Sequence, residues 1–294
     1  MQADNIYRPL TATPFKCCAA YKEIAPCRML KPYIRCFWCG EYSGREEGAE
    51  FLAKEYSCTD YPRIVIPDTC VDIIYRIDHI DQKVTAGFSG INDRSFYICG
   101  DEKAGHKLSV FAIRFYAWGA YAFAEDSFKG TLNGHYDVRE RFNWLDKELR
   151  SRLAEPGNLA DRIRLTERLL LERLEAFRSN HVINDAISNI LLNHGSVEVS
   201  RLSKECFVSG RQLERLFLEY IGITPKKLSN LVRYQFLWND IVTRNDFDIM
   251  DAVHKYGYTD SAHLMREFRR YHSMNICAAR DMAFKHRSSV QRSG

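Results

Sequence analysis

The sequence lacks several features that would assign it to common classes of protein. No apolar run in its 294 residues reaches the roughly 18 residues that a membrane-spanning helix needs, so we expect no membrane partner. The N-terminal residues do not show the basic and then apolar layout of a signal peptide, which predicts a cytoplasmic location. No glycine-rich phosphate loop follows a strand-like run, and no spacing of His, Asp and Ser indicates nucleophilic catalysis. We therefore predict that the protein is not an enzyme and needs no cofactor.

Cysteine is plentiful, but it forms no recognisable metal or disulfide pattern. Eight of the ten cysteines lie in the first 100 residues, and without a signal segment we interpret them as reduced thiols. Cys36 and Cys39 have the spacing of a zinc knuckle. Phe37 and Trp38 between them favour a strand instead, in which residues three apart project to opposite faces. No second pair of ligands follows, so we predict no metal site.

Positive charge is concentrated near the C-terminus. Residues 195–294 contain 16 Lys and Arg against 11 Asp and Glu, a net charge of +5. Residues 1–194 contain 26 against 27, a net charge of −1. A local excess of basic side chains is what a partner that carries phosphates requires.

The sequence pattern divides the chain into three regions and predicts an α+β protein. Residues 1–137 contain short β-type runs separated by turn residues, which predict a mostly antiparallel sheet or barrel. Residues 138–192 change to helical periodicity, and residues 193–294 are predicted to form an all-α domain. The predicted strands are Tyr33–Cys39, Arg63–Ile66, Cys70–Ile77, Lys83–Phe88, Ser95–Cys99 and Leu108–Phe115.

The predicted helical extension carries an apolar stripe with two interpretations. The stripe consists of Leu159, Ile163, Leu170, Leu174 and Phe177. It could pair with the same stripe of a second copy, which would give a homodimer, or it could pack on the sheet of its own chain. The run 193–196, Asn-His-Gly-Ser, is the predicted hinge between the two halves.

The most informative feature is a repeat within the last hundred residues. Residues 197–225 and 247–277 each predict a short amphipathic helix, a tight turn and a second helix with the pattern L-x-R-x-F. That is the sequence form of a helix-turn-helix, whose second helix can lie in the DNA major groove. Two copies about 50 residues apart predict two recognition helices in one chain.

Residues at the helix ends of both copies support this interpretation. In the first copy, Ser209 is placed to cap the recognition helix, and Gly222 is placed to end it in a left-handed conformation. Thr224 then begins a connecting helix that continues to about residue 242. The first recognition helix is predicted to turn Leu213, Leu216 and Phe217 inward, and the second Leu264 and Phe268. In the second copy Gly257 supplies the turn, and either Asp260 or Ser261 caps the helix.

These motifs resemble the AraC/XylS family of bacterial transcription regulators. The likeness covers residues 197–281, with two helix-turn-helix units, G-I-T-P after the first and a G-Y turn in the second. Residues 28–130 are similar to the N-terminal domain of some relatives, without indicating a ligand. The resemblance implies a transcription regulator whose β-rich domain senses an effector and whose all-α domain binds double-stranded DNA. We count a small-molecule effector, RNA polymerase and a second copy of the chain among its candidate partners.

The resemblance also implies which side chains contact DNA. Base-edge contacts are expected from Arg211, Glu214 and Arg215 in the first recognition helix and from Ala262, His263 and Arg266 in the second. Phosphate contacts are expected from Lys226, Lys227, Arg269 and Arg270. The arginines of the two L-x-R-x-F motifs have the alternative of a phosphate or structural role.

The sequence departs from the family's pattern at three places. Phe207 stands where a turn glycine is common, and Val253 occupies a position that is usually smaller. The run 273–276, Ser-Met-Asn-Ile, replaces a G-x-[ST]-P stop, so we expect the last turn to be less firmly set.

Two other functions stay open at this point. Cys27, which lies between Pro26 and Arg28, could be a reactive thiol, either an alkylation or redox sensor or a methyl acceptor, coupled to DNA binding. The predicted recognition helices could also bind a protein rather than DNA.

Overall fold

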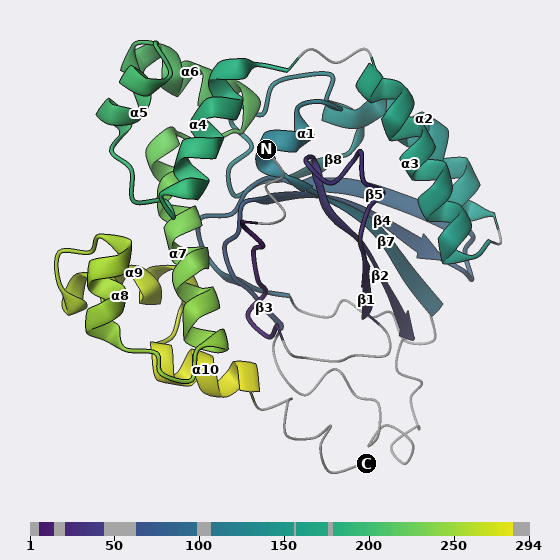
Figure 1. The fold of residues 1–294 in the computed structure, drawn as a ribbon. Coiled ribbons are helices and arrows are strands. Elements are labelled where there is room, and N and C mark those ends of the chain that lie inside the picture. Colours follow the sequence, from purple (N-terminus) through teal and green to yellow (C-terminus); the bar gives the residue numbers. More distant parts are fainter. Residues whose placement is uncertain are drawn as a thin grey trace, which may run out of the picture.

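The protein consists of an antiparallel sheet domain and a bundle of helices beside it (Figure 1). The computed structural model describes residues 6–14, 21–43, 63–98, 107–155, 157–175 and 179–284. Its strands are β1 (Tyr21–Ile24), β2 (Ile34–Ser43), β3 (Arg63–Val65), β4 (Cys70–Asp78), β5 (Lys83–Ser89), β6 (Phe96–Ile98), β7 (Lys107–Tyr116) and β8 (His135–Asp137).

Six strands form one sheet in the order β1-β2-β7-β4-β5-β8, and β3 and β6 form a separate pair. Every pairing between the described strands is antiparallel. Within the described residues the sheet stays open between β1 and β8, so of the two predicted alternatives the sheet is confirmed rather than the barrel. All six predicted strands are present. The short strands β1 and β8 were not predicted, because neither has the alternating apolar pattern that marks a strand.

One face of the sheet carries the core of this domain. Val71, Ile73 and Tyr75 alternate on β4 and are buried, as the sequence predicts. They lie opposite Phe115, Ile113 and Phe111 of β7, which are also buried. Helix α2 packs over β4 and β5, and Phe142, Leu145, Leu149 and Leu153 are its buried apolar residues.

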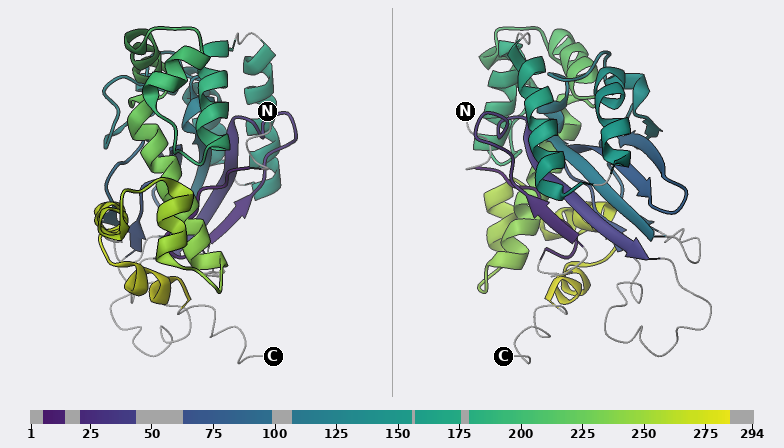
Figure 2. Two further views of the ribbon diagram at one scale, coloured as in Figure 1. Left: turned by 60° about the vertical axis from the view of Figure 1, so that its left-hand side comes forward. Right: turned by 90° about the vertical axis from the view of Figure 1, so that its right-hand side faces the viewer.

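The other elements of the described chain are helices (Figures 1 and 2). They are α1 (Ala117–Ala120), α2 (Arg139–Ala154), α3 (Leu159–Glu175), α4 (His181–Leu192), α5 (Val199–Glu205), α6 (Gly210–Tyr220), α7 (Pro225–Thr243), α8 (Ile249–Tyr256), α9 (Ser261–His272) and α10 (Ile276–Phe284). No helix in the described ranges combines the length and the apolar character that crossing a bilayer requires.

The apolar stripe of α3 is largely covered within the chain. Ile163 and Leu170 are buried, and α3 packs against α2. Leu159 and Leu174 are half-buried, whereas Phe177 lies outside the described residues. The stripe therefore packs on its own chain, and its use in a homodimer stays a prediction.

The predicted hinge at residues 193–196 is a tightly packed turn. Gly195 has a φ of +77°, and a Cβ on it would clash with the carbonyl oxygen of Ser229 in α7. The Ser196 hydroxyl donates a hydrogen bond of 2.7 Å to the carbonyl oxygen of Tyr256. Helix α4, which precedes the turn, packs against α5, α6 and α7. The glycine therefore permits a close approach to α7, and the interpretation of this run as a hinge stays a prediction.

Helix α7 lies between the sheet domain and the last helices. The Gln235 side-chain amide donates to the carbonyl oxygen of Pro67 at 2.6 Å, and the Trp238 indole donates to the carbonyl oxygen of Thr11 at 3.0 Å. Tyr220, the last residue of α6, stacks on Tyr121 with ring centroids 4.0 Å apart. The sheet domain therefore contacts α7 along its length and the C-terminal end of α6.

Candidate DNA-binding surface

The first helix-turn-helix unit, α5 and α6, has the local structure that its sequence predicts. The Ser209 hydroxyl accepts a hydrogen bond of 3.2 Å from the backbone N–H of Gln212 and so caps α6. The side chains of Leu213, Leu216 and Phe217 are buried. Gly222 ends the helix at a φ of +87°, in the left-handed conformation.

The opposite face of α6 is open to solvent. Arg211, Glu214 and Arg215 are exposed, and Leu218 is half-buried. Arg215 lies 3.5 Å from Glu219 on the same helix. Because an exposed pair of this kind is worth less than about 1 kcal/mol, Arg215 can exchange it for a contact with DNA.

The second unit, α8 and α9, repeats this arrangement. Gly257 has a φ of +65° in the turn, as predicted. The side chain of Asp260, rather than Ser261, caps α9 by accepting a hydrogen bond of 2.6 Å from the His263 N–H. Leu264 and Phe268 are buried.

The exposed face of α9 contains one residue that the prediction missed. Ala262, Arg266, Arg269 and Arg270 are exposed as expected. Met265 is 47% exposed on the same face, where no base contact was assigned. Aligning Leu213 with Leu264 in the two L-x-R-x-F motifs would have identified Met265 as the equivalent of Glu214.

The exposed stripes of the two helices can therefore be matched position by position. The matched pairs are Arg211 with Ala262, Glu214 with Met265, Arg215 with Arg266, and Leu218 with Arg269. His263 lies outside this stripe, because it is half-buried and packs edge-on against the ring of Tyr258, 5.3 Å away. We therefore favour Met265 over His263 as a residue that can reach a base.

A buried ion pair attaches α9 to α7. The Arg233 Nη2 atom donates to both carboxylate oxygens of Glu267, at 2.7 and 2.9 Å. The Tyr258 hydroxyl donates to the same carboxylate at 3.0 Å, and the Arg233 guanidinium lies over the Tyr258 ring, 4.3 Å from its centroid. Both charged side chains are about nine-tenths buried, so the pair fixes α9 on the connecting helix.

The last turn is formed without the expected glycine and proline, and its lower firmness stays a prediction. Ser273 takes the left-handed conformation with a φ of +58°, in place of the expected glycine. The Asn275 side chain then accepts a hydrogen bond of 2.8 Å from the Ala278 N–H and so caps α10. Ala279 and Ala283 of α10 are buried. Serine thus takes the left-handed conformation of the family's glycine, and asparagine caps the next helix in place of the family's threonine.

A histidine is buried just before this turn. His272 is fully covered, and its Nδ1 atom forms a hydrogen bond of 2.8 Å with the Tyr234 hydroxyl. Burial lowers the pKa of His272 to about 3. The side chain is therefore neutral near pH 7, which makes it part of the core and not of the basic surface.

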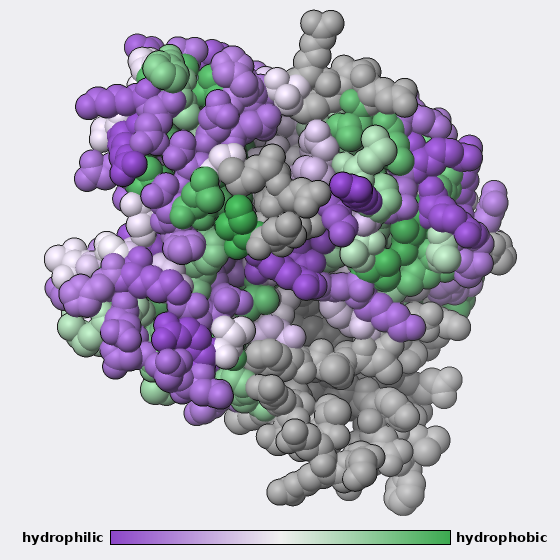
Figure 3. Space-filling model, viewed as in Figure 1, coloured by the Kyte–Doolittle hydropathy of each residue, from purple (hydrophilic) through white to green (hydrophobic). Residues whose placement is uncertain are grey.

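The predicted phosphate contacts are exposed, but Lys227 already has an acidic partner. Lys226 and Lys227 lie in the first turn of α7, directly after the first unit. The Lys227 ammonium lies 2.8 Å from a carboxylate oxygen of Asp93, in the sheet domain. In the space-filling view, two mostly hydrophilic lobes lie at the positions of α5–α6 and α8–α9, with an indentation between them (Figure 3).

The cysteines form no site within the described residues. Cys36 and Cys39 both lie on β2, as the strand prediction requires, and burial raises the pKa of Cys36 to about 12. The described part of the chain contains no group of three or more His, Cys, Asp or Glu that could hold a metal ion. Cys27 is half-buried, and its role as a reactive thiol stays untested.

Two protein families match separate parts of the chain. A family described as a helix-turn-helix domain matches residues 202–282, and a domain of unknown function, DUF6597, matches residues 22–136. The C-terminal region is an AraC-type helix-turn-helix domain. A domain of this kind supports a DNA-binding transcription regulator. The resemblance to the AraC/XylS family is thereby confirmed.

Several solved structures are similar to the chain. A regulator with an AraC-type DNA-binding domain from Chromobacterium violaceum is 21% identical, with 36% of this chain and 94% of that chain covered and a TM-score of 0.33. ToxT from Vibrio cholerae is 11% identical, with 85% and 98% covered and a TM-score of 0.40. ToxT with an unsaturated fatty acid bound is 10% identical, with 84% and 95% covered and a TM-score of 0.40.

A search of curated proteins found no match.

Proposed function

We propose that this AraC-type regulator is sequence-specific and that α6 and α9 bind successive major-groove segments on one face of a duplex. The observation that carries the proposal is the pair of matched exposed stripes, each opposite a buried face that is anchored in the bundle with α7. Groove segments one helical turn apart are separated by about 34 Å, and a rigid connector favours one such separation.

The side chains of the two stripes suit different base pairs. Arg211 can make a bidentate contact to guanine, and Glu214 can accept from cytosine. Ala262 and Met265 are apolar and suit a thymine methyl group. We therefore propose that α6 prefers G·C pairs and that α9 prefers A·T pairs at its exposed apolar positions.

The experiment is selection of bound duplexes from a random pool by the full-length chain. We expect Arg211→Ala to relax the preference at one G·C position and to cost about 1–3 kcal/mol on the selected site. Lys226→Ala should weaken binding on all sequences and reduce the salt dependence, as loss of a phosphate contact does. Arg168→Ala, which removes an exposed arginine from α3, is the matched control and should change neither.

Equal weakening by Arg211→Ala on selected and scrambled duplexes would place Arg211 on a phosphate instead of a base. A full-length chain that binds no duplex, even at low salt, would contradict the proposed function itself.

We further propose that the sheet domain modulates DNA binding in response to an effector. The support for this proposal is the contact of the sheet domain with α7 and with the end of α6. Screening small molecules for a shift in the thermal unfolding of the full chain tests it, and a hit must also change DNA affinity. RNA polymerase and a second copy of the chain remain predicted partners.

A further inference from the structure

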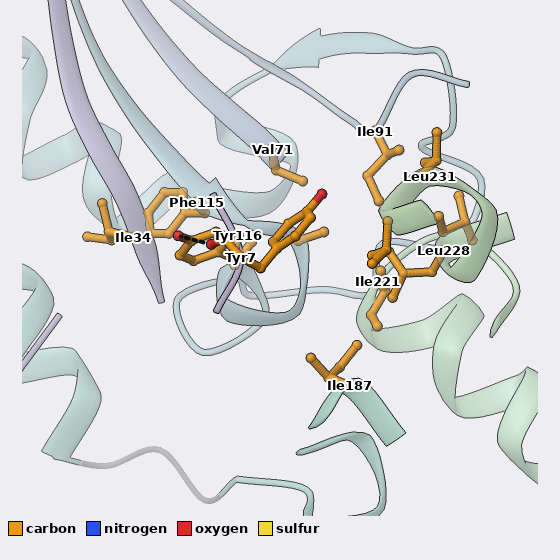
Figure 4. Close-up of a cluster of buried hydrophobic side chains, with 14 of the residues drawn as sticks. Tyr7, Ile34, Val71, Ile91, Phe115, Tyr116, Ile187, Ile221, Leu228 and Leu231 are labelled. Atoms are coloured by element: carbon orange, nitrogen blue, oxygen red, sulfur yellow. Dashed lines mark hydrogen bonds between the residues drawn. The ribbon is translucent and has the colours of Figure 1, made fainter. Parts of the chain in front are cut away.

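One loop of the sheet domain contacts the DNA-binding domain at both helix-turn-helix units. This interdomain loop comprises residues 90–95. Its Asp93 pairs with Lys227 after the first unit, and its Ser95 hydroxyl forms a hydrogen bond with the Ser273 hydroxyl at the end of the second. Ile91 is buried and points toward Leu228 and Leu231 of α7 (Figure 4).

The Asp93 carboxylate is held in place by a neighbouring loop. The Asp93 N–H donates to the side-chain oxygen of Asn133 at 2.9 Å, and the Asn133 side-chain amide donates back to Asp93 Oδ1 at 2.8 Å. The Asn133 N–H also donates to the carbonyl oxygen of Ile91 at 2.8 Å. These bonds leave Asp93 Oδ2 directed at Lys227.

Asp93 is ionised at neutral pH in this arrangement. Burial acts to raise the pKa of Asp93, but the hydrogen bonds from Lys227 and Asn133 outweigh it and lower the pKa below the usual value. The partner of Lys227 is therefore a full negative charge.

Lys227 lies where a charge matters for DNA. It belongs to the first turn of α7, whose N-terminus is itself favourable for a phosphate group. Its neighbour Lys226 is exposed and has no ion pair within the described ranges. An ammonium group that is bound to a carboxylate contributes less to phosphate binding than a free one, so the two lysines are not equivalent.

We propose that Asp93 competes with DNA phosphate for Lys227, so that the sheet domain lowers the affinity of the regulator for DNA while the interdomain loop is in place. This inference rests on the proposed function. Movement of the loop away from α7 frees the lysine for DNA. Because Ser95 binds the second unit, the same movement also releases the end of α9.

A double-mutant cycle on the full-length chain tests the competition. Binding to the duplex selected by the wild-type chain is measured over a range of salt concentrations for Asp93→Asn, Lys227→Ala and the double variant. We expect Asp93→Asn to raise affinity roughly two- to fivefold, the scale of an exposed ion pair. It should also steepen the slope of log affinity against log salt by up to about 0.9, the value for one further phosphate contact.

Comparing the effect of Asp93→Asn in different backgrounds isolates the contribution of Lys227. Removing a negative charge favours DNA binding in any background, and Asp81→Asn, in the exposed turn between β4 and β5, measures that general effect. The gain from Asp93→Asn should be at least about twofold smaller in the Lys227→Ala background than in the wild-type chain. In a Lys226→Ala background, the gain in affinity from Asp93→Asn should be as large as in the wild-type chain.

A second variant tests the same contact without a substitution at Asp93. Asn133→Gly keeps the positive φ of +58° at this position but removes the side chain that holds Asp93, so it should act in the same direction as Asp93→Asn. Unchanged thermal unfolding would show that each variant is folded.

Three results would overturn the competition. They are an equal gain in the wild-type and Lys227→Ala backgrounds, no gain beyond that of Asp81→Asn, and a loss of affinity in Asp93→Asn. These three results can be obtained only if the wild-type chain binds DNA. A chain for which neither the wild type nor Asp93→Asn binds any duplex contradicts the proposed function instead.

Discussion

The two helix-turn-helix units follow the same sequence pattern but are anchored by different chemistry. In the first unit Leu216 of α6 is buried among apolar side chains. The equivalent residue of α9 is Glu267, which forms a buried ion pair with Arg233 of α7. The pattern L-x-R-x-F therefore decides which face of each recognition helix is exposed, whereas the buried face can be apolar or charged.

The two recognition helices also end differently. Gly222 ends α6 against the sheet domain, where a Cβ would lie 2.7 Å from the carbonyl oxygen of Phe128. Ser273 occupies the equivalent place after α9, and buried His272 precedes it where α6 has Ile221. The first unit is thus tied more closely to the sheet domain, and the second carries the buried polar groups.

The largest expected effect comes from making the second unit resemble the first. Glu267→Leu removes one partner of the ion pair and leaves the Arg233 charge buried, which should cost about 3–5 kcal/mol. Amide hydrogen exchange should show faster opening of α9, with α6 less affected. The double variant Arg233→Met with Glu267→Leu should recover most of the loss. Wild-type protection of α9 in Glu267→Leu would show that the ion pair does not anchor the helix.

The next effect is a pH dependence that the second unit has and the first lacks. The pKa of His272 is lowered to about 3 in the fold, below the ordinary value of about 6.5 for an unfolded chain. As the pH falls, His272 is therefore protonated in the unfolded chain before it is protonated in the folded chain. The contribution of neutral His272 to the free energy of unfolding is complete above about pH 6.5 and is lost as the pH falls toward 3.

At pH 4.5 the loss from His272 should reach about 2–3 kcal/mol. Urea unfolding at pH 7 and pH 4.5 measures it, and His272→Phe should remove this part of the pH dependence. An equal pH dependence in the wild type and in His272→Phe would assign the effect to other groups.

The smallest expected effect concerns the two turns. Phe207 has a φ of +55° with its side chain 95% exposed, so its ring gains nothing from burial while its backbone is unfavourable. Phe207→Asn should stabilise the first unit by roughly 0.5–1 kcal/mol, since asparagine tolerates this conformation. Gly257→Ala should destabilise the second by about 1 kcal/mol, because alanine is strained at the φ of +65°, although a Cβ there would meet only Ser196 at ordinary contact distance. Thermal unfolding shows whether each variant is more or less stable than the wild type. Stabilisation by Gly257→Ala would show that the positive φ at this position does not require glycine.

Local features of the fold were predictable from the sequence. Ser209, Thr224 and Asp260 cap helices by bonding an N–H three residues ahead, so the chemistry and the partner both lie within one short stretch. Buried positions such as Leu213 and Leu264 follow from helical spacing alone. The exposed face of each recognition helix was therefore largely predicted.

Contacts between distant residues were not predictable in this way. Arg233 and Glu267 are 34 residues apart, and Asp93 and Lys227 are 134 apart. No local pattern links such pairs, so the anchoring of α9 and the contact of Lys227 with the sheet domain emerged only from the fold. The close approach of Gly195 to Ser229 in α7 was not predictable for the same reason.

The most direct test of two recognition helices on one connector varies the spacing of their binding segments. The full-length chain is titrated with the selected duplex and with the same duplex carrying an insertion of about 5 base pairs, half a helical turn, between the two protected segments. We predict that the insertion reduces affinity at least about tenfold, because α6 and α9 can no longer reach both segments on one face. Equal affinity for the two duplexes, or selection of a single short segment, would contradict the account.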